Sequence, residues 1–322
     1  MSGPCLSEND VLAFYDGALS SAAIARLEAH VDACSSCRQW LSGTAAALGM
    51  TEAPMGPPGG SLRREQIVAG RYQVVRFLGA GGMGEVYEAE DRELGERVAL
   101  KTVRATLSDE HRSIARLKRE VSLARKVTHP NVCRIFDLGT EEDSASGQVV
   151  FLSMELLTGE SLATRLARGR MTAAEALPVL AQIAEGLEAA HRAGVVHRDM
   201  KSSNVMLVPD ADRGLRVVLT DFGLARTDEV LDAGLSEPGM LVGSPAYMAP
   251  EQVSGGPVTS AIDVYALGVV LYEMVTGRLP FPAENPLSCM TKRLHEPPPS
   301  PGMLVPDLPS AWETAILRCL ER

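Results

Sequence analysis

The spacing of apolar residues changes along the chain, and the change predicts which segments are strands and which are helices. Between residues 71 and 103, short runs rich in Val, Tyr and Leu are separated by turns that contain glycine. This pattern predicts β-strands at Arg71–Leu78, Glu85–Glu90 and Arg97–Val103. This part of the chain is therefore expected to start as a β-meander.

A helix is expected from Ser108, whose side chain can cap the first turn. Apolar residues then recur on one stripe, at Ile114, Leu117, Val121 and Ala124. Glu120 lies on the same stripe. Because an unpaired carboxylate on an inward face is costly, Glu120 is expected to have a partner.

A second long helix is predicted from Thr172, which can form a capping box with Glu175. The apolar positions that follow at helical spacing are Leu177, Leu180, Ala184 and Leu187. Gly194 can end this helix. Pro178 lacks a backbone donor, which predicts a kink in the first turns.

A linker divides the chain into a small head and a large body. Residues 51–66 contain three prolines and three glycines with little apolar periodicity, as is typical of a linker. In the head, residues 1–50, a helix is predicted after Ser20, with an apolar stripe from Ile24 to Cys34. A shorter apolar segment, Val11–Leu19, precedes this helix. Two short helices form only a thin core, and domains of that size usually need a metal or a disulfide.

Composition and charge restrict the class of protein. The 322 residues are 45% hydrophobic and 22% charged, as in a globular protein of about two domains. The 41 acidic and 31 basic residues give a net charge of -10, which argues against a nucleic-acid binder or a polybasic membrane-surface protein. The most apolar run, Val264–Val275, is shorter than the ~20 residues that cross a bilayer, and the first residues lack a signal-peptide pattern. We expect no membrane segment and a cytoplasmic location.

The strongest local motif is a glycine-rich turn between the first two predicted strands. Gly79, Gly81 and Gly84 have the spacing G-x-G-x-x-G, which lets backbone amides approach phosphate groups. A dinucleotide-binding fold would need a helix after these glycines, whereas Glu85 continues as a strand. Lys101 lies on the third predicted strand, where it is either a residue at the sheet edge or a partner for phosphate and a buried carboxylate.

Further motifs follow in order: HRDMKSSN at 197–204, DFG at 221–223 and APE at 249–251. Together with the glycine turn and VALK at 98–101, they resemble the signature set of protein kinases. The resemblance covers residues 71–322. It implies an α+β fold for residues 67–322, with a β-rich N-lobe (67–157) and an α-rich C-lobe (158–322), preceded by the small helical head.

The resemblance also implies a role for each motif in phosphoryl transfer. Lys101 would hold the α- and β-phosphates of ATP and pair with Glu120. Asp221 and Asn204 would hold Mg²⁺, Asp199 would accept the proton of the substrate hydroxyl, and Lys201 would steady the γ-phosphate. The nucleotide-binding positions implied in this way are Gly79, Ala80, Gly81, Gly82, Met83, Gly84, Val86, Ala99, Lys101, Met154, Glu155, Leu157, Asn204 and Asp221.

Residues around these motifs indicate the type of kinase and its control. Lys201, and the segment GSPAYMAPE with Ser244 in place of the commoner Thr, resemble Ser/Thr kinases. Arg198 before Asp199 is an arrangement that in kinases usually pairs with a phosphate on the loop ahead of APE. We expect autophosphorylation at Ser236, with Thr227 as the second choice.

Other polar residues of the body have structural explanations. Asp263, in a predicted helix that is apolar on nearly every side, resembles the buried aspartate that braces the catalytic loop of kinases. His129 and His191 are expected to be packing or turn residues, because phosphoryl transfer already has its base in Asp199.

The head carries a second candidate site. His30, Cys34 and Cys37 have the spacing H-x-x-x-C-x-x-C, which suits tetrahedral zinc, and Cys5 is the expected fourth ligand. The alternative is a surface histidine beside a thiol pair, either reduced or forming a redox disulfide. With DGALS at 16–20, the pattern resembles the zinc-binding anti-sigma domains of bacteria. Three functions remain open for the head: it binds a sigma factor, it senses oxidants through its thiolates, or it mediates contacts with other proteins.

The sequence thus predicts a bacterial-type Ser/Thr protein kinase that uses ATP and Mg²⁺ and has a zinc-binding head. The alternatives are a non-enzymatic nucleotide-binding scaffold and an anti-sigma-type binder regulated by the kinase-like domain. Kinases of this kind continue past the helix predicted at Trp312–Arg322 into a further helix, whose arginine pairs with the glutamate matched by Glu251. Because the chain stops at Arg322, we expect a truncated domain, or Arg318, Arg322 or another chain in place of that arginine.

Overall fold

The computed structural model describes most of the body of the chain. The described residues are 61–81, 84–103, 110–143, 147–212, 214–222, 245–282 and 286–321. The chain divides into two compact units, and all of these residues belong to the larger, Met55–Ser236 with Val242–Arg322. Several predicted site residues lie outside the described residues: Cys5, His30, Cys34, Cys37, Gly82, Met83, Thr227, Ser236 and Ser244.

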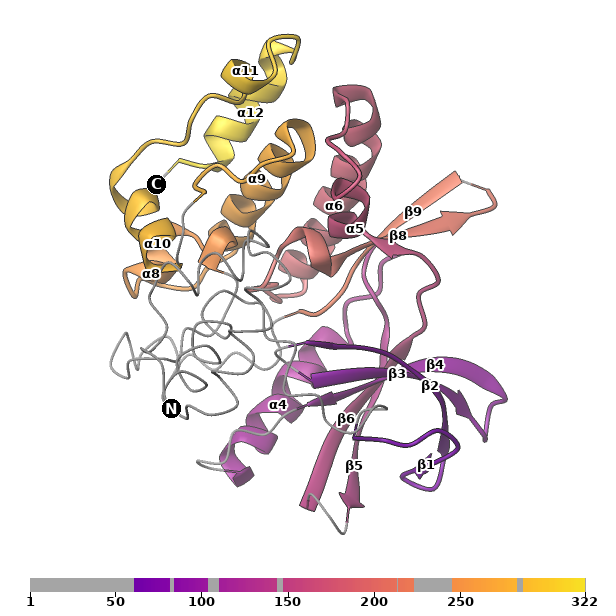
Figure 1. Cartoon of the computed structure of the whole chain (residues 1–322). Helices are drawn as coiled ribbons and strands as arrows, with labels where there is room; N and C mark the ends of the chain where they lie inside the picture. The colour runs from indigo at the N-terminus through magenta and orange to yellow at the C-terminus, as the bar shows by residue number, and fades with distance from the viewer. Residues whose placement is uncertain are drawn as a thin grey trace, which may run out of the picture. The chain divides into compact units, whose positions relative to one another are not determined.

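The first lobe is an antiparallel sheet of six strands with one helix beside it (Figure 1). The strands occur in the order β1-β2-β3-β4-β6-β5 across the sheet. Their bounds are β1 Ile67–Val68, β2 Tyr72–Gly81, β3 Gly84–Asp91, β4 Glu96–Val103, β5 Ile135–Asp143 and β6 Gly147–Glu155, and the helix is α4, Glu110–Ala124. The predicted meander is thus β2, β3 and β4, confirmed within a few residues at each end.

The core of this lobe lies on one face of β2, β3 and β4, where alternate residues such as Val74, Tyr87 and Leu100 are buried. Leu62 belongs to the same core, and its backbone N–H donates to the Tyr87 hydroxyl at 3.1 Å. Residues 61–66, the last part of the predicted linker, therefore pack on the sheet, and the linker ends before its predicted bound at residue 66. Proline and glycine content marks a break in periodicity but not the residue at which burial resumes.

Helix α4 packs its predicted stripe against the sheet. Leu117 and Val121 form a small core with Val150 and Leu152 of β6, and Ala124 is also buried. The amphipathic pattern of this segment therefore identified its inward face, on which Glu120 is half-buried.

The second lobe is helical, with a small three-stranded sheet in the order β7-β8-β9. Its helices gather around α9 (Figure 1). The elements are β7 Glu160–Ser161, α5 Leu162–Leu166, α6 Ala173–Arg192, η1 Ser202–Asn204, β8 Val205–Asp210, β9 Gly214–Leu219, η2 Pro245–Tyr247, α8 Pro250–Val253, α9 Ala261–Thr276, α10 Pro286–His295, α11 Pro301–Leu304 and α12 Ser310–Cys319.

Helix α6 begins with the predicted capping box, in which Thr172 and Glu175 each bond the other's backbone N–H. Gly194 follows its end with φ +74°, a conformation that favours glycine. Pro178 lies inside the helix, which continues through it.

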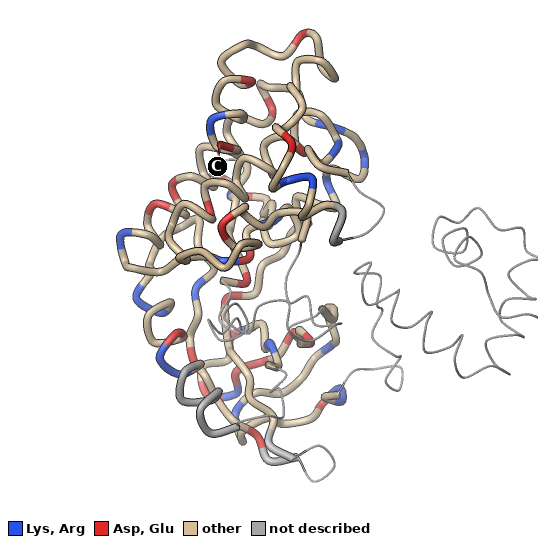
Figure 2. Tube along the Cα trace, turned by 90° about the vertical axis from the view of Figure 1, so that its left-hand side faces the viewer, with Lys and Arg blue, Asp and Glu red and all other residues tan. Residues whose placement is uncertain are grey.

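Helix α9 is buried on nearly every side, as its mostly apolar composition predicts. Among the described residues, no helix combines the length and the apolarity that a membrane crossing needs. Acidic and basic positions are interspersed along the described trace (Figure 2), so the net negative charge is not gathered in one segment of it.

Candidate active site

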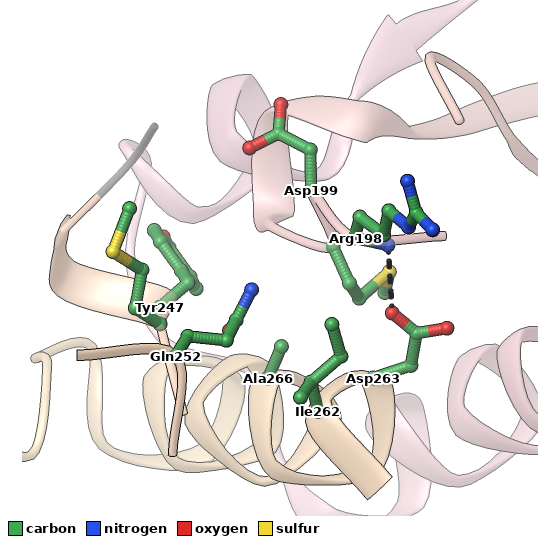
Figure 3. Close-up of a pocket in the computed structure, with 9 residues that line it drawn as sticks. Arg198, Asp199, Tyr247, Gln252, Ile262, Asp263 and Ala266 are labelled. Carbon is green, nitrogen blue, oxygen red and sulfur yellow. Dashed lines mark hydrogen bonds between the residues drawn. The ribbon is translucent and has the colours of Figure 1, made fainter. Parts of the chain in front are cut away.

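The segment His197–Asn204 forms a loop whose backbone is hydrogen-bonded to helix α9. Asp263 is 1% exposed, and its carboxylate accepts the backbone N–H groups of His197 at 2.7 Å and Arg198 at 2.9 Å (Figure 3). The Nε2 atom of His191 lies 2.8 Å from the same carboxylate. The predicted bracing role of Asp263 and the packing role of His191 are confirmed.

Two non-glycine residues of the site have left-handed backbone conformations, Arg198 with φ +63° and Asp221 with φ +57°. Such conformations are disfavoured for most side chains and persist where the surroundings hold them. At Arg198, the two hydrogen bonds to Asp263 provide that support.

His197 is fully buried beside this loop and stacks on Phe222, with ring centroids 4.5 Å apart. Burial lowers the pKa of its imidazole, so the ring is neutral at physiological pH. Its Nδ1 atom accepts the Asp199 N–H at 3.3 Å. The neutral ring thus helps to set the backbone of Asp199 without adding a charge.

Two polar side chains of the loop, those of Asn204 and Lys201, meet at Asp199, whose carboxylate is almost fully buried. The Asn204 side-chain amide donates to the Asp199 carbonyl at 2.8 Å and to its carboxylate at 3.1 Å. The Lys201 ammonium lies 3.1 Å from the same carboxylate. Because the Asn204 amide nitrogen is turned toward Asp199, its amide oxygen is turned away and can bind a cation.

Lys101 is brought to this region by the register of the sheet. It lies opposite Val86 of β3, and Val86 lies opposite Gly79 of β2, so the three residues form a row across neighbouring strands. Lys101 is 8% exposed, and its ammonium lies 2.6 Å from the Asp221 carboxylate. The lysine of VALK and the aspartate of DFG therefore meet, although 120 residues of sequence separate them.

Two glycines of the turn differ in the space that surrounds their Cα atoms. Gly84 has φ +142°, and a Cβ atom there would lie 1.8 Å from the Thr102 carbonyl oxygen, so only glycine fits. A Cβ atom at Gly79 would meet nothing within 4 Å. The space over Gly79, the ammonium of Lys101 and the oxygen ligands of Asp221 and Asn204 are the features that a nucleotide triphosphate with Mg²⁺ requires.

Glu120 has a different partner from the one that the resemblance implied. Its Oε1 atom lies 3.6 Å from the guanidinium of Arg198, whereas the ion pair of Lys101 is with Asp221. No Lys101–Glu120 ion pair is present among the described residues, so that pair stays a prediction. The ammonium of Lys101 is engaged by Asp221 at 2.6 Å, and Arg198 supplies the cation that the half-buried Glu120 needs.

The strand that leads out of the sheet is tied to the helical lobe by an arginine that the sequence patterns did not single out. Arg216 of β9 forms a bidentate ion pair with Glu155, at 2.6 and 3.2 Å, and its Nε–H donates to the Pro130 carbonyl at 2.6 Å. Met154, the residue before Glu155, lies opposite Ala99 of β4. A basic residue within the apolar run LRVVL was the one signal that could have identified Arg216.

A small pocket lies beside Asp199, between the loop, the segment after η2 and helix α9 (Figure 3). Its lining combines polar and apolar side chains: Arg198, Asp199, Met200, Tyr247, Met248, Gln252, Ile262, Asp263 and Ala266. The Tyr247 hydroxyl donates to Glu273 at 2.7 Å and lies 3.0 Å from the Ser202 hydroxyl. Burial raises the pKa of both Tyr247 and Glu273. This network joins η2 to the loop that carries Asp199.

Glu251 is half-buried at the start of α8, and among the described residues its carboxylate has no cationic partner. Arg318 is exposed on α12 and makes no ion pair within the same described ranges, and Arg322 is outside them. The substitution of Arg318 for the expected arginine is therefore not formed.

The geometry agrees with the comparisons to known proteins. Residues 72–305 match the family model described as the protein kinase domain. The chain belongs to the protein kinase family. The kinase domain is similar to Serine/threonine-protein kinase PknA of Mycobacterium tuberculosis, with 39% identity over 243 residues, which are 75% of this chain and 54% of PknA. It is also similar to Serine/threonine-protein kinase PrkC of Bacillus subtilis, with 36% identity over 252 residues, 78% of this chain and 37% of PrkC. The chain thus spans about half or less of these relatives.

Solved structures support the same assignment. The crystal structure of the Mycobacterium tuberculosis PknI kinase domain matches with a TM-score of 0.63 and 28% identity, covering 81% of this chain and 92% of that one. The two-lobed α+β kinase fold expected from the sequence is therefore confirmed.

The head is similar to a second family. Residues 10–38 match a family model described as a zinc finger. This match includes His30, Cys34 and Cys37, whereas Cys5 precedes it. In the part of the chain that the structure describes, no group of three or more His, Cys, Asp or Glu side chains could hold a metal ion, and all four expected zinc ligands lie outside that part.

Proposed function

We propose that this chain is a Ser/Thr protein kinase that transfers the γ-phosphate of ATP to serine and threonine hydroxyls of proteins. Two sets of contacts support this most. Lys101 forms an ion pair with Asp221, and the carboxylate of Asp199 contacts both the Lys201 ammonium and the Asn204 amide. The names of the relatives, all Ser/Thr protein kinases, agree with this type of acceptor. A non-enzymatic scaffold is not favoured, because it would have no need for the complete set of these side chains.

In the proposed reaction, each side chain positions or neutralises a reacting group. Lys101 binds the α- and β-phosphates, and Lys201 steadies the γ-phosphate. Asp221 and Asn204 would hold Mg²⁺, which offsets negative charge on the transferring group. The oxygen of the substrate hydroxyl forms a bond to the γ-phosphorus, the bond from that phosphorus to the β-phosphate bridging oxygen breaks, and ADP leaves. Asp199 orients the hydroxyl and accepts its proton.

We also propose that the arrangement of Lys101 and Glu120 changes when the kinase is activated. In active kinases the lysine pairs with the helix glutamate and the DFG aspartate holds Mg²⁺. Here Lys101 is on Asp221 and Glu120 is on Arg198. A phosphate that competes for Arg198 would release Glu120 toward Lys101.

The experiment that tests the function uses the full chain with γ-labelled ATP, Mg²⁺ and peptide libraries that carry one central Ser, Thr or Tyr. We expect labelled phosphoserine and phosphothreonine, little phosphotyrosine, and loss of labelling when Mg²⁺ is chelated. Absence of transfer to Ser and Thr peptides would overturn the proposed function.

A second expected result concerns the loop between Asp221 and Ala249. Active enzyme is expected to phosphorylate itself at Ser236, with Thr227 as the weaker site, because a phosphate there can pair with the guanidinium of Arg198. Phosphopeptide mapping of wild-type enzyme incubated with ATP, against Asp199→Asn as the control that cannot transfer phosphate, measures this. Active enzyme with neither residue modified would refute the assignment.

We propose that the head binds one structural Zn²⁺ through Cys5, His30, Cys34 and Cys37. The zinc-finger family match and the small size of the head support this. A sigma factor is one candidate partner for the head, and oxidation of its thiolates is another candidate role. A place in bacterial signal transduction is proposed because the similar proteins are Ser/Thr protein kinases of bacteria. The cytoplasmic location stays a prediction from the sequence.

Metal analysis is expected to find about one zinc per chain. Chelation with EDTA should unfold the head, seen as loss of helical signal, while the kinase domain keeps its own thermal transition. Cys34→Ser should lose the metal, and Cys319→Ser, a change in α12 of the kinase domain, should keep it. A head that is insensitive to EDTA and to Cys34→Ser would contradict the zinc site.

A further inference from the structure

Helix α10 contains a fully buried arginine that no motif accounts for. Arg293 is 1% exposed, and no carboxylate forms an ion pair with it among the described residues. A buried guanidinium without a carboxylate is costly unless its donors are satisfied in another way. The contacts of Arg293 therefore indicate what its charge is used for.

The guanidinium donates to two consecutive carbonyls of η2. Nη1 bonds the Pro245 carbonyl at 2.5 Å, and Nη2 bonds the Ala246 carbonyl at 2.6 Å. The central carbon of the group lies 5.7 Å from the ring centroids of both Tyr265 and Phe281. Arg293 thus fixes the backbone of η2 to α10, and the planar shape of its guanidinium suits two adjacent acceptors.

The same short segment continues into the site. Tyr247, the last residue of η2, is bonded to Ser202 and Glu273, and Ser202 follows Lys201 in the loop that carries Asp199. Tyr247 and Met248 line the pocket beside Asp199 (Figure 3). Residues 245–248 are therefore held at one end by Arg293 and at the other by the catalytic loop.

One atom of Arg293 remains without a partner. Its Nε is buried and makes no hydrogen bond within the described part of the chain. A side chain selected only for core stability would not retain this unmet donor, because an apolar residue of similar volume avoids the cost. The placement of the guanidinium on two carbonyls accounts for the retained charge.

We propose that Arg293 is a positioning residue for the protein substrate. It holds residues 245–248 beside Asp199, where Tyr247 and Met248 line the pocket and the part of the substrate next to its acceptor hydroxyl would lie, and it does not act on ATP. The inference rests on the proposed kinase function, since it assigns part of the substrate contact of the same site. It predicts that removing the two hydrogen bonds weakens peptide binding and leaves nucleotide binding unchanged.

The test compares Arg293→Met, Arg293→Lys and the control Lys292→Met in the full chain. Lys292 is the neighbouring basic residue on α10, and its ammonium donates to the Pro282 carbonyl at 3.1 Å, away from η2. The measured quantities are KM for the best serine peptide of the library, KM for ATP, and ATP hydrolysis without peptide. Thermal melting of each variant reports its folding.

For Arg293→Met we expect peptide KM to rise about tenfold, while ATP KM and peptide-independent ATP hydrolysis stay within about twofold of wild type. Arg293→Lys should give an intermediate peptide KM, because one ammonium reaches one carbonyl in place of two. Lys292→Met should match wild type.

An unchanged peptide KM in an active Arg293→Met enzyme would overturn the inference alone. A parallel loss of peptide and ATP parameters, or failure of both Arg293 variants to fold, would show a purely structural role and also overturn it. A wild-type enzyme that labels no peptide would overturn the proposed function together with this inference.

Discussion

The Asp199→Asn variant is expected to lose phosphate transfer by about 10³-fold while it still binds ATP with Mg²⁺. Asparagine has nearly the same shape as aspartate, and its side-chain oxygen can still accept from Asn204. It cannot take the proton of the substrate hydroxyl, and it has no charge to hold Lys201, which lies 3.1 Å from the carboxylate in the wild type. The measurement is the rate of peptide labelling at saturating ATP, beside nucleotide affinity from fluorescence or calorimetry.

The matched control for this change is Asp212→Asn. Asp212 is an exposed residue near the turn between β8 and β9, so the same chemical substitution there should leave labelling within about twofold of wild type. Asp199→Asn enzyme with labelling within about tenfold of wild type would contradict the assignment of Asp199 as the proton acceptor. A loss of nucleotide affinity equal to the loss of rate would instead indicate a misfolded site.

The Lys101→Met variant is expected to lose at least about a hundredfold in kcat/KM for ATP. Methionine retains much of the volume of lysine but removes the cation for the phosphates and for Asp221, 2.6 Å away. Removing one partner of a pair that is largely shielded from water leaves the other charge uncompensated. Steady-state labelling at varied ATP concentrations measures the effect, with melting curves to confirm folding.

Lys118→Met is the control for Lys101→Met. Lys118 is exposed on α4, so removal of its charge should change kcat/KM for ATP by less than about twofold. Retention of near-wild-type kcat/KM in folded Lys101→Met enzyme would exclude Lys101 as the phosphate ligand and would separate the chain from phosphate-transferring kinases.

The elements of the fold were more predictable from the sequence than the faces that they bury. Helix α6 shows why. The predicted stripe contained Leu177 and Ala184, which are exposed, Leu177 by 56%, whereas Ile183 and Ala190 are in the core. Both stripes of this helix are apolar at a spacing of three to four residues, so periodicity alone does not distinguish them. The choice depends on which neighbouring helices and strands α6 contacts, and that is a property of the tertiary fold.

The candidate site was predictable where a residue type is demanded by its chemistry and position. Asp263 under the loop and Lys101 near Asp221 are placed as their motifs indicate, whereas the close approach of Gly84 to Thr102 is known only from the structure. The prediction that Glu120 needs a partner is confirmed. The sequence does not decide between Lys101 and Arg198 as that partner, because the two residues are far apart along the chain.

Two arginines that hold the site were not predicted. Arg216 lies in an apolar run, whereas Arg293 follows Lys292 in a helix of mixed polarity, and both bind main-chain carbonyls of distant residues. A carbonyl acceptor has no side-chain signature, so no motif in the sequence pairs it with its donor.

The central claim is that Lys101, Lys201, Asp199, Asn204 and Asp221 act on one nucleotide. A crystal structure of the chain with Mg²⁺ and a non-hydrolysable ATP analogue tests it most directly. We predict the triphosphate over Gly79, with Lys101 on the α- and β-phosphates, Asp221 and Asn204 on Mg²⁺, and Asp199 facing the γ-phosphate beside Lys201. A nucleotide bound elsewhere, or a metal held by neither Asp221 nor Asn204, would contradict the account.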